Sequence, residues 1–406
     1  MEKPENILWQ SPDGKDHLEI YSRVLQRHVP TMEDSVYRKL EKIYSIMSFA
    51  YFQNRPEIDS SELDAQLGDL HDNFETGMFP LKGEYMMNDG ECELRNALIE
   101  GDTNRVMAYL SSISDFDTAN KLLEGYEPFT SDDLKSGSNE SFDFWAKAGK
   151  LGDPNKLRFE EEEKTGVPHI ETANDYMGKQ IYHTFQEKIK DGDEIRVLDL
   201  GGGTGGTTEA IIHWVYECAK RENMPSINMH VETVEFNDGL AKGLETKKEL
   251  LEAKYSGCRV NVVNADMQTY ISEKTALTLD DFDVVSASYS IHHLLNDDKK
   301  ELLDNAYSVL KEGGLMMWAD PNEGKSDINK SFFNLTDEGT FASFTSHEQA
   351  KQMLEDAGFK AHVASDAPYI SEICSEFMSQ SETDILMDNC HNHNGFVCIG
   401  VKCSSA

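Results

Sequence analysis

The sequence predicts an α/β fold, with a mostly parallel sheet flanked by helices and an N-terminal α-helical region ahead of it. A β-favouring run at 195–200 ends in a glycine-rich turn and continues as an apolar segment at helical spacing, 210–218. Strand-like and helix-like segments then alternate to the end of the chain, which is typical of a parallel sheet. The N-terminal third shows apolar residues at helical spacing only.

The N-terminal helical region is expected to span residues 1–141. Its first helix is predicted from residue 32 to residue 50, where apolar side chains recur every three or four positions. A second helix begins at an apparent capping sequence at Ser61. The later helices are predicted at 92–99, 104–113 and 116–123. This region carries no catalytic signature, so its expected roles are capping an active site or forming a homodimer.

A second domain is expected to span residues 142–406, after a polar linker at 130–141. A helix around 174–189 precedes its first strand. The predicted strands lie at 195–200, 229–235, 259–264, 282–286, 314–319, 359–364 and 395–402. A helix at 299–310 separates the fourth strand from the fifth. A further helix begins at Ser346, which forms a capping pattern with Gln349, and ends at Gly358.

The glycine-rich turn predicts a site for a nucleotide-like ligand. Gly201, Gly203 and Gly205 carry no Cβ and tolerate positive φ, so the backbone can approach a ligand closely. The helix that follows directs its free N–H groups to the same place. The Gly-x-Gly-x-x-Gly pattern of nicotinamide-binding domains is also met, by Gly201, Gly203 and Gly206. A nicotinamide cofactor is therefore the main competing interpretation.

Five motifs in order resemble those of the class I S-adenosylmethionine-dependent methyltransferases. They are Val-Leu-Asp-Leu-Gly-Gly-Gly-Thr-Gly (197–205), Val-Glu-Phe (234–236), Asn-Ala-Asp-Met (264–267), Phe-Asp-Val-Val-Ser-Ala-Ser-Tyr-Ser-Ile-His-His-Leu (282–294) and Leu-Lys-Glu-Gly-Gly-Leu (310–315). The last motif and the His-His-Leu favour this family over nicotinamide-binding domains. The resemblance implies a seven-stranded Rossmann-like sheet whose last strand is antiparallel, and S-adenosyl-L-methionine as the cofactor.

The resemblance also implies which residues bind the cofactor. Asp199 and the turn at 201–205 would hold its methionine part, and Glu235 would bond both ribose hydroxyls. Phe236 would lie beside the adenine, whose amino group would donate to Asp266. The full set expected to bind the cofactor is Asp199, Gly201, Gly203, Thr204, Gly205, Glu235, Phe236, Asp266, Met267 and Ser286.

The expected catalytic residues directly follow the fourth strand: Tyr289, His292 and His293. In open α/β sheets, ligands bind beyond the carboxyl ends of the strands. An imidazole, whose ordinary pKa is near 6.5, can take a proton from an acceptor at neutral pH. A positioning or structural role for the two histidines stays open. Asp320 and Glu323 follow the fifth strand, where they could orient a cationic acceptor or cap the loop.

Composition narrows the range of partners. Lys+Arg total 38 against 74 Asp+Glu, a net charge of −36, which repels phosphate backbones and anionic lipid. Neither nucleic acid nor a membrane is expected as a partner. The seven cysteines form no Cys-x-x-Cys pair, which suits reduced thiols and a cytoplasmic location. Cys390, His391 and His393 have poor spacing for ligands, so no metal is expected.

The sequence therefore predicts a methyltransferase that acts on a small-molecule acceptor through an O, N or S nucleophile. Asn-Pro-Pro-Tyr, with which the resembling adenine and glutamine methyltransferases grip their acceptors, is absent, and Ser-Ala-Ser-Tyr (286–289) stands there. The helical region and the inserted loops 322–344 and 366–394 are expected to shape the acceptor pocket. A catalytically silent donor-binding protein and a protein methyltransferase are the alternatives.

Overall fold

The computed structural model describes residues 34–56, 86–147, 151–160, 168–224, 227–277, 281–324, 341–364 and 395–403, which form two compact units. The helical unit comprises Met1–Lys150, His293–Leu295 and Asp327–Phe344. The sheet unit comprises Leu151–His292, Asn296–Ser326 and Thr345–Ala406. The helix predicted at 61–74 and most of the loops 322–344 and 366–394 lie outside the described residues.

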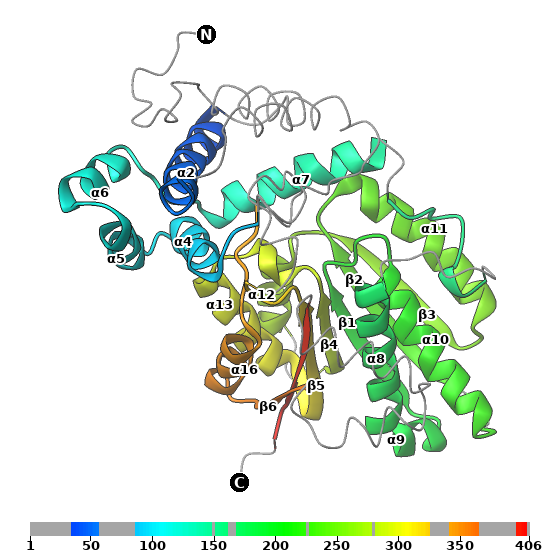
Figure 1. Ribbon diagram of the computed structural model, residues 1–406. Helices are drawn as coiled ribbons and strands as arrows, with labels where there is room; N and C mark the ends of the chain where they lie inside the picture. Colours follow the sequence, from blue (N-terminus) through cyan, green and yellow to red (C-terminus); the bar gives the residue numbers. More distant parts are fainter. Residues whose placement is uncertain are drawn as a thin grey trace. The chain divides into compact units, whose positions relative to one another are not determined.

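A seven-stranded sheet forms the centre of the sheet unit (Figure 1). Its strands are β1 (Glu194–Leu200), β2 (Asn228–Glu235), β3 (Cys258–Asn264), β4 (Phe282–Ser288), β5 (Leu310–Asp320), β6 (Lys360–Val363) and β7 (Phe396–Val401). The spatial order is β3-β2-β1-β4-β5-β7-β6. Strands β1 to β5 pair in parallel, and β7 runs antiparallel to both β5 and β6. The predicted sheet with an antiparallel last strand is confirmed.

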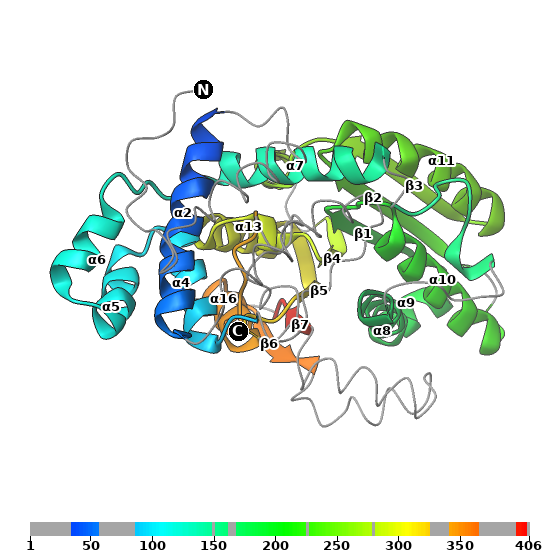
Figure 2. The ribbon, with the colours of Figure 1, turned by 45° about the horizontal axis from the view of Figure 1, so that its top comes forward.

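Helices cover both faces of this sheet (Figures 1 and 2). One face carries α8 (Pro168–Thr184), α10 (Gly206–Arg221) and α11 (Asp238–Lys254), while the short α9 (Gln186–Asp191) leads into β1. The other face carries α12 (Met267–Leu277), α13 (Asn296–Val309) and α16 (His347–Asp356). The chain order therefore reverses between β1 and β4, and in such sheets the ligand crevice lies at that reversal.

Burial on both faces of the sheet explains why the central strands β1 and β4 consist mostly of apolar residues. All seven residues of β4 are buried, and the last four of β1 are buried as well. Ile195, Val197 and Val284 pack with α8 and α10 side chains on one side of the sheet. Strands buried on both faces are expected to be largely apolar, as these are apart from polar residues such as Arg196 and Asp283 toward their amino ends and Asp199, Ser286 and Ser288 toward their carboxyl ends.

The predicted capping of α16 is present in the structure. The Ser346 hydroxyl accepts a hydrogen bond from the Gln349 backbone N–H at 3.2 Å, and the Gln349 side chain accepts one from the Ser346 N–H at 2.9 Å. Gly358, with φ +99°, follows the end of the helix, where glycine tolerates a left-handed conformation. The signals that predicted the start and stop of this helix are confirmed.

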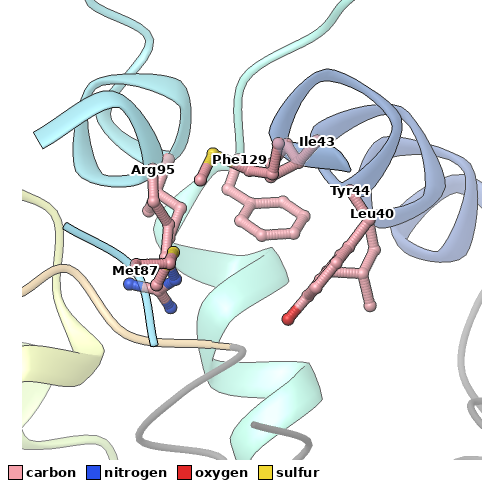
Figure 3. A pocket seen from close by; sticks show the side chains of 8 residues that line it. Leu40, Ile43, Tyr44, Met87, Arg95 and Phe129 are labelled. Carbon is pink, nitrogen blue, oxygen red and sulfur yellow. The ribbon is translucent and has the colours of Figure 1, made fainter. Parts of the chain in front are cut away.

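The helical unit consists of α2 (Asp34–Gln53), α4 (Asp89–Glu100), α5 (Thr103–Ile113), α6 (Phe116–Leu123) and α7 (Ser131–Lys147). The helices predicted at 32–50, 92–99, 104–113 and 116–123 are confirmed. Figure 3 shows the ring of Phe129 between side chains of α2, among them Ile43 and Tyr44, and Arg95 of α4. The cavity there measures about 10 Å³, room for about one water molecule.

The polar stretch 130–141 is helical from Ser131 onward, so its prediction as a linker is wrong. Thr130 and Asp133 close the first turn, because the Thr130 N–H donates to Asp133 Oδ2 at 2.6 Å and the Asp133 N–H donates to Thr130 Oγ1 at 3.2 Å. Leu134 and Ser138 lie one turn apart and are both buried. The sequence offers only this narrow buried stripe, and the domain boundary predicted after residue 141 falls inside α7.

Candidate functional site

The glycine turn between β1 and α10 has the backbone geometry that its sequence predicts. Gly201, Gly203 and Gly205 have φ values of +76°, +53° and +82°. A Cβ on Gly201 would lie 2.4 Å from Ser290 Cβ, so only glycine permits this close approach to the residues after β4. A Cβ on Gly203 would meet nothing within 4 Å, which leaves open space beside the backbone there.

Glu235 lies at the carboxyl end of β2 and contacts the same turn. Its Oε2 accepts a hydrogen bond from the Gly203 N–H at 2.8 Å, and its Oε1 accepts one from the Asn237 N–H at 2.8 Å. Burial raises the pKa of Glu235, against the lowering effect of these backbone bonds. A carboxylate oxygen accepts more than one hydrogen bond, so Glu235 retains capacity for ligand hydroxyls.

Asp199, near the end of β1, is fully buried beneath the turn. Its Oδ2 accepts from the Thr208 hydroxyl at 2.6 Å, and its Oδ1 accepts from the Ser286 hydroxyl at 2.8 Å. Burial raises the pKa of Asp199, while the two hydroxyl bonds lower it. Asp199 thereby ties β1 to the first turn of α10 and to β4. Its predicted contact with the methionine part of a cofactor stays a prediction, as does a cofactor contact of Ser286.

Asp266 and Met267 lie where β3 leads into α12. Asp266 Oδ1 accepts hydrogen bonds from the Thr269 backbone N–H at 3.0 Å and from the Thr269 hydroxyl at 3.1 Å. Asp266 thus caps α12, whose first residue is Met267. Phe236 directly follows β2 and is half-buried. The adenine contacts predicted for these three residues stay predictions.

His292 and Asp320 form a buried pair at the carboxyl ends of β4 and β5. His292 Nδ1 lies 2.7 Å from Asp320 Oδ1, and the Trp318 indole N–H donates to Asp320 Oδ2 at 2.6 Å. His292 and Asp320 are each about 1% exposed. Because a carboxylate only accepts, Nδ1 is the ring nitrogen that donates to Asp320, and in the neutral imidazole the lone pair is then on Nε2. This is the arrangement in which an imidazole acts as a general base.

Strand register explains how residues 28 positions apart meet. Strands β4 and β5 are parallel neighbours with Ser288 opposite Ala319, and the turn at Ile291–His293 brings His292 back over the end of β5. Ser290, two residues earlier, donates its hydroxyl proton to the Leu200 carbonyl at 2.9 Å. The loop that carries His292 is thus tied by Ser290 to β1, the strand that leads into the glycine turn.

The other two predicted catalytic residues have different surroundings. Tyr289 has φ +52°, a strained conformation for a non-glycine residue, and its N–H donates to the Ala319 carbonyl at 2.7 Å. His293 belongs to the helical unit, where its Nδ1 lies 2.8 Å from the Ser138 hydroxyl and 3.2 Å from the Phe341 carbonyl. The two adjacent histidines therefore have separate partners: His292 pairs with Asp320, and His293 contacts Ser138 and the Phe341 carbonyl.

Two residues of the site were not predicted from the sequence. Trp318 orients Asp320 through its indole N–H. From the sequence alone, a tryptophan within a buried strand is expected to be a core residue. Asn174 on α8 accepts hydrogen bonds from the hydroxyls of Thr207 and Ser288, at 3.2 Å and 2.7 Å. No spacing in the sequence joins these three positions. Their proximity follows from α8 packing against α10 and β4.

The residues that form this site lie within a stretch of the chain that matches a known protein family. Residues 172–363 match the family model described as a methyltransferase domain. The matched range covers the glycine turn, Glu235, His292 and Asp320. The chain carries a class I S-adenosylmethionine-dependent methyltransferase domain. The nicotinamide-binding alternative is set aside on this finding.

Individual relatives are distant. The uncharacterized methyltransferase YcgJ of Bacillus subtilis is 25% identical over 142 residues, which are 35% of this chain and 46% of that protein's length. A SAM-dependent methyltransferase from Archaeoglobus fulgidus is 20% identical, with a TM-score of 0.34, over 56% of this chain and 94% of that one. The CurJ carbon methyltransferase is 13% identical, with a TM-score of 0.40, over 95% of this chain and 99% of that one.

S-adenosylmethionine is the methyl donor of this family, and the methyltransferase domain has residues that fit it. The turn offers open space beside Gly203, and a buried carboxylate lies at the end of the neighbouring strand. A carboxylate in that place suits ribose hydroxyls. Among the described residues, no group of three or more His, Cys, Asp or Glu could hold a metal ion, and no helix is long and apolar enough to cross a membrane.

Proposed function

We propose that this methyltransferase domain transfers a methyl group to a small-molecule acceptor whose O, N or S nucleophile is relieved of a proton by His292. The observation that carries the proposal is the buried His292–Asp320 pair at the carboxyl edge of β4 and β5. That edge is where ligands bind in open α/β sheets. The pair is joined through Ser290 to the strand that leads into the glycine turn.

Each residue has a defined part in the reaction. When bound, S-adenosylmethionine supplies a methyl group on a positively charged sulfur. Glu235 and the glycine turn fix the position of the bound donor, and proximity with correct orientation accounts for much of the rate. Asp320 and Trp318 hold the imidazole of His292 with its Nδ1 protonated. His292 Nε2 takes the acceptor's proton as the methyl group is attacked.

Burial of the pair favours a small acceptor. Water is excluded from His292, which strengthens its interaction with Asp320. The chain's net charge of −36 disfavours polyanionic acceptors, so nucleic acid is not proposed as a substrate. Transfer to a protein side chain and donor binding without catalysis are the competing functions. It stays a prediction that the acceptor pocket is shaped by the helical region and by loops 322–344 and 366–394.

We place the activity in the cytoplasm. None of the described cysteines, Cys92, Cys218, Cys258, Cys398 and Cys403, forms a disulfide. Burial raises the pKa of Cys218 to about 11 and that of Cys258 to about 12, so neither is reactive at neutral pH. Free thiols are typical of a reducing compartment. Homodimerisation through the N-terminal helices stays a prediction, which light scattering of the purified chain would test.

Incubation with methyl-labelled S-adenosylmethionine tests the proposal. The wild-type protein and His292→Gln would each receive a low-molecular-weight metabolite extract and, separately, a protein extract. With the wild-type protein, we expect the methyl label to appear in small molecules of the metabolite extract. With His292→Gln, we expect no label there. Label in the protein fraction would support a protein methyltransferase. Donor binding without label in either fraction would support the silent binding protein.

A further inference from the structure

A pocket of about 290 Å³ lies on the α8 side of the sheet, beside the last turn of that helix. Small-molecule sites in proteins begin at about 300 Å³, so this space suits a molecule of modest size. Its lining comes from α8 and from three strands at one edge of the sheet, and includes Gln180, His183, Leu315, His362, Ile399 and Val401.

This pocket is separate from the site at the carboxyl ends of the strands. Leu315 precedes Asp320 on β5 by five residues, which is about 16 Å along a strand. Gln180 follows Asn174 on α8 by six residues, which is about 9 Å along a helix. Asp320 and Asn174 both belong to the carboxyl-end site. The pocket therefore lies toward the opposite edge of the sheet.

Gln180 gives the pocket a buried hydrogen-bond donor. The residue is 6% exposed, and its Nε2 has no hydrogen-bond partner among the residues that the structure describes. Buried amide groups are nearly always hydrogen-bonded, because an unpaired one costs folding free energy. The last side-chain torsion of glutamine is soft, so a small rotation turns Nε2 toward an acceptor in the pocket. A bound molecule with an acceptor oxygen would satisfy this donor.

The remaining lining favours a ligand without charge. Three of the side chains, on β5 and β7, are aliphatic, and the described lining residues include no Asp, Glu, Lys or Arg. His183 and His362 add imidazole groups. Burial lowers the pKa of His362, and the positive charges of Lys360 and Lys351 lower it further, so this ring is neutral at pH 7. An ion would lose its hydration here without meeting an opposite charge.

We propose that this pocket is a second ligand site, which binds a small uncharged molecule with an aliphatic body and a carbonyl oxygen. The aliphatic body packs on Leu315, Ile399 and Val401, and the carbonyl oxygen accepts a hydrogen bond from Gln180 Nε2. The inference goes beyond the proposed function, since neither the methyl donor nor His292 takes part in this binding.

Two probes that differ in one group test the inference. Cycloheptanone is an uncharged aliphatic ring with one carbonyl oxygen, and methylenecycloheptane has a =CH₂ group in its place. NMR spectra of the full chain, labelled at Ile, Leu and Val methyl groups, would be recorded during titration with each probe. With both probes we expect saturable shifts of the Leu315, Ile399 and Val401 methyl signals, and unchanged signals around the glycine turn.

Gln180→Met removes the donor and keeps an unbranched side chain of similar length. We expect this variant to bind cycloheptanone about 3- to 10-fold more weakly, as for a lost neutral hydrogen bond, and methylenecycloheptane within about 2-fold of wild type. Gln352→Met makes the same change at an exposed position of α16 and should alter neither affinity. Val401→Trp places a bulky ring in the pocket and should abolish the binding of both probes.

Thermal unfolding without probe gives an independent check. Gln180→Met should melt at the wild-type temperature or above it, because the variant has lost an unpaired buried donor. A lower melting temperature would mean that Gln180 bonds within the chain, and would overturn the inference. Three NMR results would also overturn it: no shift with cycloheptanone, shifts confined to the glycine turn, or equal weakening of both probes by Gln180→Met.

Discussion

At the scale of single residues, the clearest chemistry belongs to His292, whose Nδ1 is held by Asp320. Replacement by Gln removes the basic nitrogen from a side chain of similar reach. We expect the turnover rate to fall by about 10²- to 10⁴-fold, the usual contribution of a general base. Asp320→Asn should also lower turnover, because the amide no longer holds the proton on Nδ1. Initial rates measured against pH for wild type and both variants would check this.

His293→Gln is the control for that experiment. His293 contacts Ser138 and the Phe341 carbonyl, so its replacement should change thermal stability and leave the acid limb of the rate profile in place. If the turnover of His292→Gln matches wild type while His293→Gln loses activity, the assignment of the base to His292 is wrong.

Asp199 gives a pH-dependent contribution to stability. Burial raises its pKa in the folded protein above the unfolded value of about 3.9. Between these two values the folded state binds more protons than the unfolded state, so the free energy of unfolding falls as pH rises through that window. Asp199→Asn removes this titration. Urea denaturation between pH 4 and pH 7 should show a shallower loss of stability for the variant than for wild type.

The comparison between the two proteins controls for other titrating groups, since Glu235 and the surface carboxylates are present in both. A steeper pH dependence in Asp199→Asn would mean that the carboxyl is stabilised in its charged form.

The residues of the site were not equally predictable from the sequence. The glycine turn, Glu235 and the histidines lie within contiguous motifs, and strand ends are predictable from local pattern. The pairing of His292 with Asp320 depends on the register of β4 against β5. Asn174 depends on how α8 packs against α10. Such long-range distances follow from tertiary packing, which the local pattern does not contain.

At the scale of elements, the turn between β1 and α10 depends on glycine for two separable reasons. Gly201 and Gly203 both have positive φ, but only a Cβ on Gly201 would collide with Ser290. Gly203→Ala should cost about 1–2 kcal/mol of folding free energy from backbone strain. Gly201→Ala should cost about 1–3 kcal/mol more, because overpacking adds to that strain. Urea denaturation of the two variants would measure both costs.

The pair serves as its own control, since each substitution adds the same methyl group within one turn. Equal destabilisation by the two would contradict the steric role assigned to Ser290.

The helix α7 shows why an element can be missed. Its sequence is rich in Ser, Asp and Asn, which favour turns and caps. Tertiary contacts outweigh this preference: Leu134 is fully buried in the core of the helical unit, and Asp133 pairs with Lys39 on α2 at 2.7 Å. The strands were easier to predict because their apolar runs are continuous.

At the scale of the whole molecule, the net charge of −36 governs contacts with other polyelectrolytes. We expect no shift of single- or double-stranded DNA or RNA in a gel at low salt, where attraction to phosphate would be strongest. A basic nucleic-acid-binding protein run alongside verifies the sensitivity of the gel. A salt-sensitive shift with this chain would contradict the exclusion of nucleic acid.

We expect S-adenosylmethionine to bind at the carboxyl ends of β1 and β2, beside the glycine turn, and equilibrium titration calorimetry tests this binding most directly. S-adenosylmethionine and S-adenosylhomocysteine should bind the wild-type protein, and NADH should not. Glu235→Ala should make the binding free energy of both adenosyl ligands less favourable by about 1.5–3 kcal/mol, the contribution of hydrogen bonds to a charged group. Binding of NADH together with no detectable heat from either adenosyl ligand would contradict the account.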